Sequence, residues 1–120
     1  MILHIIGRAD WAQAQATGVH HAASLADVGF THCSDPGTLL LPAHAVYAGR
    51  TDLLLLEIDP ALVGAPVRWE VPEPPAPLPL LFPHVYGPIP VAAVVGVHEF
   101  PLADDGTFHL PASLAELGTT

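Results

Sequence analysis

Three short segments of this sequence carry a histidine in surroundings that could place an imidazole in a polar site. They are LHII with His4, FTHCS with His32 and FPHVYG with His84. Histidine titrates near neutral pH, so its ring nitrogens can take up or release a proton as well as bind hydroxyl or phosphate groups. We therefore expect the three imidazoles to meet in one polar cleft.

His32 is followed by Cys33 and Ser34, and in an extended chain successive side chains point to opposite faces. His32 and Ser34 should share one face, where an imidazole beside a hydroxyl could hold a phosphate, a ribose or an amide, while Cys33 faces the other way. A nucleophilic Cys33 activated by His32 or His84 is an alternative. We favour an inert core cysteine, because free cysteines are among the most buried residues.

The segment FPHVYGPIP alternates Phe82, His84 and Tyr86 among prolines and Gly87. We expect an imidazole and a phenol to project from a rigid loop, where binding residues are frequently found. Arg68, in VRWE, is one of only three arginines in the chain and is a candidate anion contact. A structural salt bridge is an equally good expectation for it.

The remaining histidines give weaker signals. His4 interrupts an apolar run, and that position alone favours a core histidine whose ring is satisfied by backbone groups. Two adjacent pairs, His20-His21 and His32-Cys33, are the closest candidates for a metal site. Adjacent side chains on a strand point to opposite faces, so we expect no metal at either pair.

The charge balance limits the partners of this chain. Twelve Asp and Glu stand against three Arg and no Lys, which gives a formal net charge of -9. Binding to nucleic acid or to an anionic membrane depends on clustered Lys and Arg, so we expect neither partner. The single cysteine excludes an intrachain disulfide, and the apolar runs are too short to span a bilayer. With no signal-peptide pattern, we expect a cytoplasmic location.

The elements that must position these residues follow from the spacing of apolar residues and chain breakers. Expected strands cover 1–6, 29–34, 52–58, 67–71, 91–100 and 107–110, and expected helices cover 11–17 after an Asp10 cap and 36–47 after an Asp35 cap, with a kink or restart at Pro42. We expect a loop with one helical turn over 19–28, an extended proline-rich surface loop over 72–83 and a turn-rich connection over 84–90. Early helices followed by strands favour a single α+β domain over residues 1–120.

Five motifs occur together in the chain: LHII, GFTHCSDP, AGRTDLLLLEIDP, VRWE and FPHVYGPIPVAAVV. In combination they resemble a bacterial family, domain of unknown function 952, over nearly the whole chain. Members of that family resemble the ADP-ribosyltransferase fold. The resemblance implies an α+β domain in which two small mixed or antiparallel sheets, with two or three short helices, form a cleft that holds NAD in the enzymes.

The resemblance also assigns roles to individual residues. His4 matches the first motif, an arginine or histidine on an early strand, and the segment from Thr31 to Ser34 corresponds loosely to the second, near the nicotinamide ribose. The third motif usually supplies a glutamate that polarises the ribose, but FPHVYGP has a histidine there. Together with the residue patterns described above, these matches predict catalytic roles for His84 and His32, and cofactor-binding roles for a second group: His4, Thr31, Ser34, Tyr86 and Arg68.

Three classes of function stay open at this point. The first is an ADP-ribosyltransferase-like domain that binds NAD or a related nucleotide. The second is a non-enzymatic ligand-binding or interaction module on the same fold, which the missing glutamate favours. The third is a hydrolase or transferase that acts on a nucleotide or phosphoester through paired histidines. The expected partner is a small-molecule nucleotide, without a metal, and the sequence does not determine the oligomeric state.

Overall fold

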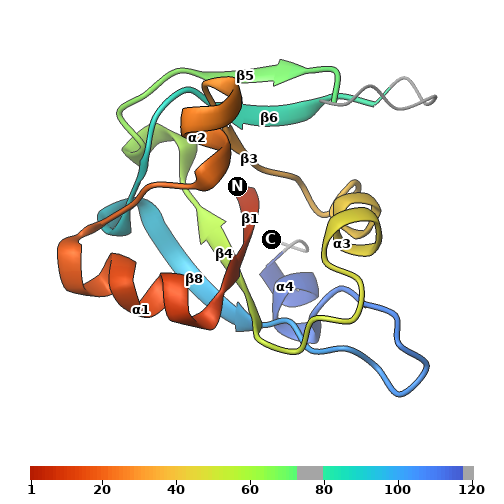
Figure 1. The fold of residues 1–120 in the computed structure, drawn as a ribbon. Helices are drawn as coiled ribbons and strands as arrows, with labels where there is room; N and C mark the ends of the chain where they lie inside the picture. Colours follow the sequence, from red (N-terminus) through yellow and green to blue (C-terminus); the bar gives the residue numbers. More distant parts are fainter. Residues whose placement is uncertain (73–79, 118–120) are drawn as a thin grey trace.

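Two three-stranded sheets and a two-stranded ribbon form the framework of the computed structural model, which describes residues 1–72 and 80–117 (Figure 1). The first sheet has the order β1 (Ile2–Gly7), β4 (Leu53–Ile58), β8 (Val94–Glu99), and the second has the order β3 (Thr31–His32), β6 (Phe82–Val85), β5 (Val67–Glu70). The ribbon joins β2 (Val19–His20) to β7 (Ile89–Pro90). The helices are α1 (Arg8–Thr17), α2 (Ala23–Val28), α3 (Leu40–Val46) and α4 (Ala112–Leu117), with 3-10 turns η1 (Pro60–Leu62) and η2 (Val91–Ala93).

The α+β class is confirmed. Each strand pairing in residues 1–72 and 80–117 is antiparallel, which is one of the two arrangements expected. The described residues form four α-helices, one more than the two or three expected. No helix within the described ranges has the length and apolar character needed to cross a membrane.

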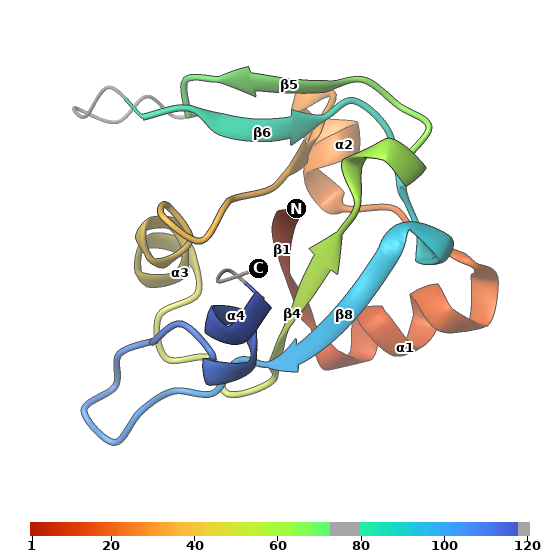
Figure 2. The ribbon, with the colours of Figure 1, turned by 180° about the vertical axis from the view of Figure 1, so that it is seen from behind.

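The central strand β4 has a hydrophobic core on both of its faces. Leu54, Leu56 and Ile58 pack in the α1-side core, together with residues of β1, α1 and the second sheet: Ile2, Ile6, Trp11, Ala14, Cys33 and Val85. Leu53 and Leu55 pack in the α3/α4-side core with Leu39, Ala43, Phe100, Phe108 and Leu114. Figures 1 and 2 show α1 on one side of this sheet and α3 with α4 on the other. Burial on both faces explains why β4 is a continuous leucine run instead of an alternating strand.

The first helix ends where the sequence predicts but begins earlier. Gly18 takes the left-handed conformation (φ 88°) and its N–H donates to Ala14 O at 2.7 Å, which terminates α1 after Thr17. The N-cap is Gly7, so Asp10 lies in the first turn and is not the cap. A carboxylate there still interacts favourably with the exposed N–H groups of the turn.

The stretch 19–28 is not the predicted loop with a single helical turn, because it contains β2 and α2. The two residues of β2 are extended because they pair with β7, about 70 residues away in the chain. None of the α2 residues is fully buried, so no periodic apolar pattern marks this helix in the sequence.

Asp35 and Pro42 have local roles that differ from the predicted ones. The Asp35 carboxylate accepts from the N–H of Thr38 at 2.9 Å and so caps a short turn, and α3 begins only at Leu40. Pro42 then falls in the first turn of α3, where a missing N–H costs no intrahelical hydrogen bond. The predicted helix over 36–47 is therefore a turn followed by a single helix from Leu40, and neither the kink nor the restart expected at Pro42 occurs.

His84 belongs to a strand, and its predicted place in a turn-rich loop is wrong. Strand β6 includes Pro83 and lies between β3 and β5. Pro83 is tolerated because it contributes its carbonyl oxygen, which accepts from Cys33 N–H at 3.2 Å, where the β3–β6 ladder ends. The predicted proline-rich loop at 72–83 falls mainly on residues 73–79, which lie outside the described residues.

The C-terminal part also differs from its prediction. Residues 107–110 do not form the predicted strand. Within this range only Phe108 is paired, in an isolated bridge to Leu102. Beyond them α4, which the sequence does not signal, packs Leu114 into the α3/α4-side core. A six-residue helix gains its stability from such packing, since its own propensity is insufficient.

Candidate functional site

His4, His20 and the backbone of His32 form a chain of hydrogen bonds. His4 Nδ1 lies 2.7 Å from His32 O, and since a carbonyl can only accept, Nδ1 carries the hydrogen. In a neutral ring His4 Nε2 is then an acceptor, so His20 Nε2, at 3.3 Å, must donate to it. This order fixes both tautomers and leaves His20 Nδ1 as a hydrogen-bond acceptor.

Burial keeps these imidazoles neutral at pH 7. The pKa of His4, whose side chain is 7% exposed, falls from 6.5 to about 4 because burial disfavours the charged ring. Burial also lowers the pKa of His20, although the nearby Asp10 carboxylate partly opposes the shift. The pKa of His32, which is only partly buried, is lowered by partial desolvation and, to a smaller extent, by the neighbouring His84 imidazole.

A second polar group connects His84 to its neighbours on β5. His84 Nδ1 lies 3.1 Å from Glu70 Oε1, and the Tyr86 hydroxyl donates to the same oxygen. This hydrogen bond from Tyr86 lowers the pKa of Glu70 and raises that of Tyr86. Phe30 stacks on the His84 ring with centroids 3.9 Å apart, and His32 meets His84 edge-on at 5.7 Å. The result is a contiguous cluster of one carboxylate, one phenol and two imidazoles.

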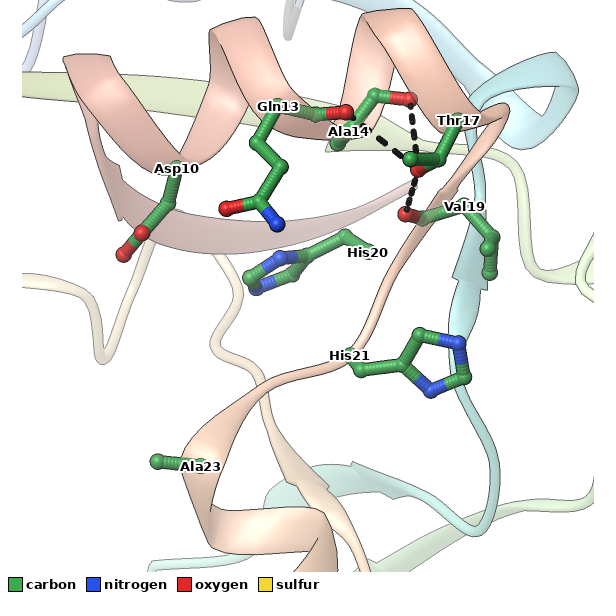
Figure 3. Close-up of a pocket in the computed structure, with 8 residues that line it drawn as sticks. All are labelled: Asp10, Gln13, Ala14, Thr17, Val19, His20, His21 and Ala23. Atoms are coloured by element: carbon green, nitrogen blue, oxygen red, sulfur yellow. Dashed lines mark hydrogen bonds between the residues drawn. The ribbon is translucent and has the colours of Figure 1, made fainter.

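A pocket of about 460 Å³ lies at the His20 end of the hydrogen-bonded chain, between α1, β2 and the start of α2 (Figure 3). Its lining consists of Asp10, Gln13, Ala14, Thr17, Val19, His20, His21 and Ala23. Figure 3 shows the His20 ring below α1, on the side to which the Gln13 side chain points. The volume falls in the range of small-molecule sites. His20 therefore connects a solvent-accessible pocket to the buried His4.

The three predicted histidines lie near one another, but their imidazoles do not all meet in one cleft, and none of the three lines the pocket. His4 reaches His32 through the His32 carbonyl, and His32 pairs with His84 across β3 and β6. His32 is exposed, whereas His84 is 2% exposed and held by Glu70 and Phe30. Both His4 nitrogens have partners within the protein. The catalytic roles of His84 and His32 and the cofactor-binding role of His4 stay predictions.

The four residues predicted to contact a ligand beside His4 differ in their surroundings. The Thr31 hydroxyl is buried and donates to Gly87 O at 3.0 Å, so it supports the fold. Ser34 is buried too, and its backbone pairs with Leu3 of β1 through two bonds of 2.7 Å. Arg68 lies over the Tyr86 ring, 5.1 Å from its centroid, in a cation–π contact. Ligand binding by Thr31, Ser34, Arg68 and Tyr86 stays a prediction.

Cys33 and the two remaining arginines have structural roles. Cys33 is buried in the α1-side core, and burial raises its pKa to about 12, so the thiol is inert at neutral pH. Arg8 and Arg50 form exposed salt bridges with Glu99 and Asp52, with N–O distances of 2.5 and 2.6 Å. Within the described ranges, no group of three His, Cys, Asp or Glu side chains is arranged to hold a metal ion.

Sequence reasoning missed His20 and Phe30 as site residues and gave Glu70 no role beside His84. His20 reaches His4 only because β2 pairs with β7, and no local sequence pattern predicts that pairing. Glu70 is a candidate from the sequence, because VRWE alternates as a strand and places Arg68 and Glu70 on one face, but its contact with His84 is not predicted. Phe30 directly precedes β3, and its stacking partner lies on a strand more than 50 residues later.

Comparisons with known proteins identify a family and a solved relative, but no activity. The family described as Protein of unknown function (DUF952) matches residues 5–97. The crystal structure of protein CC0527 from Caulobacter crescentus is 30% identical, covering 95% of this chain and 97% of its own, with a TM-score of 0.82. Its solution NMR structure gives 29% identity, 96% and 97% coverage and a TM-score of 0.78. No curated protein matches the chain.

Proposed function

The chain belongs to the DUF952 family of proteins of unknown function, and from its histidines we propose that it binds NAD or a related nucleotide in an ADP-ribosyltransferase-like fold. The observation that carries the proposal is the hydrogen-bonded chain from His32 O through His4 to His20, which ends in the pocket. That chain presents His20 Nδ1 as a fixed neutral acceptor. A ribose hydroxyl or a carboxamide N–H is a matching donor.

The charges favour the nicotinamide end of the dinucleotide for this pocket. Asp10 is an acidic lining residue, and the whole chain carries a formal charge of -9. These charges repel a diphosphate and attract the cationic ring of oxidised nicotinamide. Arg68, which pairs in register with His84, is the candidate contact for the diphosphate.

Two observations bear on whether the bound nucleotide would also react. Glu70 places a carboxylate beside His84, although it comes from β5 and not from the FPHVYGP segment where the resemblance expects it. This supports transfer chemistry. Against it, Glu70 Oε1 already accepts from both His84 and Tyr86, and the His84 ring is covered by Phe30. The second candidate is therefore a binding module without turnover, which release of nicotinamide from NAD would contradict.

Calorimetric titration with NAD, nicotinamide mononucleotide and ADP-ribose tests the binding proposal. We expect NAD and nicotinamide mononucleotide to bind, and the His20→Ala variant to bind each about 3- to 10-fold more weakly, which is the effect of one lost hydrogen bond. His109→Ala, at an exposed histidine before α4, is the matched control and should bind like the wild type. No heat and no thermal shift at millimolar NAD would refute the proposal.

A further inference from the structure

A second polar cluster lies on the opposite face of the β1–β4–β8 sheet from His4. Glu57 of β4, His98 of β8 and Ser113 of α4 meet there, and the α3/α4-side core surrounds the same face. His98 Nδ1 lies 2.6 Å from Ser113 Oγ, and His98 Nε2 bonds to Glu57 Oε1. Glu57 is 3% exposed and His98 9%, whereas Ser113 is exposed. The cluster therefore runs from a buried carboxylate to a hydroxyl at the surface.

The carboxylate determines the hydrogen positions in this cluster. As a carboxylate, Glu57 can only accept, and His98 Nε2 then carries the hydrogen. In the neutral imidazole, Nδ1 is then an acceptor, and the Ser113 hydroxyl must donate to it. A serine that donates to an imidazole whose other nitrogen is held by a carboxylate has the groups of a serine nucleophile, its base and the group that orients the base.

The local sequence accommodates this carboxylate at a cost. Glu57 ends a run of four leucines, and a buried carboxylate is several kcal/mol less favourable than an apolar side chain unless it is well paired. Gly96, opposite Glu57 in register, leaves the necessary space, because a Cβ there would come 2.7 Å from Glu57 Oε1. An apolar residue at position 57 would have extended the hydrophobic core and needed neither a hydrogen-bonding partner nor the space that Gly96 leaves.

We propose that Ser113, His98 and Glu57 form an acyl-transfer centre that hydrolyses small carboxylic esters. Ser113 Oγ attacks the carbonyl carbon while its proton passes to His98 Nδ1, and the ester C–O bond breaks as the leaving alcohol takes that proton. Water then attacks the acyl-serine, gives one proton to His98, and releases the carboxylic acid as Ser113 regains its proton. Glu57 stabilises the imidazolium and acts as a positioning residue.

The charge of the protein narrows the substrate class. With a formal charge of -9, the surface repels anionic esters, so the acyl group and the leaving alcohol should be uncharged or cationic. An acetyl ester satisfies this condition and is small enough to reach a hydroxyl at the protein surface. We therefore take p-nitrophenyl acetate and a fluorophosphonate, which forms a stable adduct with an activated serine, as probes.

The experiment compares the full chain with four variants. Peptide mass spectrometry should find the fluorophosphonate on Ser113, and Ser113→Ala, a change at an exposed side chain, should reduce acetate release to the rate of free imidazole. Ser24→Ala, on α2, is the matched control and should react like the wild type. His98→Gln should abolish both signals. Glu57→Gln should slow hydrolysis on the order of 100-fold and shift the midpoint of its pH profile, which a purely structural role would not do.

Two results would overturn the proposal. One is the absence of fluorophosphonate on Ser113 in folded wild-type protein. The other is a Ser113→Ala variant that releases acetate at the wild-type rate. In either case the cluster serves only to attach α4 to the sheet. Thermal melting of each variant separates loss of chemistry from loss of fold, and Ser113→Ala decides the matter if His98→Gln or Glu57→Gln does not fold.

Discussion

Replacing His4 by asparagine should remove much of the acid sensitivity of this protein. His4 is buried and neutral, with a pKa lowered from 6.5 to about 4. Between these two values the unfolded chain binds a proton that the folded protein does not, so stability rises with pH and is lost as pH falls from 6.5 to 4. At 1.36 kcal/mol per pH unit, the full effect is about 3.4 kcal/mol, of which about 2 kcal/mol is lost by pH 5.

Urea unfolding at pH 7 and pH 5 measures this effect. Asparagine can donate to His32 O from nearly the position of Nδ1 but does not titrate in this range. At pH 7 the variant should be about 1 kcal/mol less stable, since it loses the bond from His20. Between pH 7 and pH 5 it should lose about 2 kcal/mol less than the wild type. His109→Asn, at an exposed histidine, is the control. Equal losses in wild type and His4→Asn would show that the buried ring is not the source of acid sensitivity.

Three further predictions concern the core and the site. Cys33 should react with a thiol reagent at least about 100-fold more slowly in the native protein than in denaturant, because its thiol is buried with a pKa of about 12; equal rates would place it at the surface. Leu55→Ala should cost roughly 2–5 kcal/mol of unfolding free energy, whereas Leu62→Ala, at a side chain 52% exposed, should change it by less than about 0.5 kcal/mol. Tyr86→Phe should raise the pKa of Glu70 as measured by carboxyl NMR, since the hydroxyl is the main cause of its lowering; an unchanged titration would contradict the observed hydrogen bond.

The parts of the fold that could be predicted are those that a local pattern specifies. The leucine run of β4 is too short for a buried helix and is bounded by chain breakers, so it indicates a buried strand. Gly18 marks the end of α1 because glycine takes the left-handed conformation without strain. Asp35 indicates a capped segment, because its carboxylate can accept a backbone N–H, but the segment after it is a turn and the helix begins only at Leu40.

The parts that could not be predicted depend on pairing between distant segments. His20 enters the site through β2 and β7, two-residue strands that have no propensity signal of their own. Pro83 argues against a strand in any local reading, yet its position at the end of the β3–β6 ladder makes it harmless. Glu70 was identifiable as a strand residue, but its contact with His84 follows from the β5–β6 register.

The position of β4 between β1 and β8 has a consequence for synthesis of the chain. Strand β1 leaves the ribosome before β4 and can pair with it as soon as residues 53–58 are available. The other edge of β4 cannot pair until residues 94–99 have been synthesised. Before that point, its leucines present unpaired N–H and C=O groups beside exposed apolar side chains. A strand of this composition is prone to associate with other nascent chains. We therefore expect chains truncated before residue 94 to aggregate, and the nascent protein to depend on chaperones until β8 has emerged.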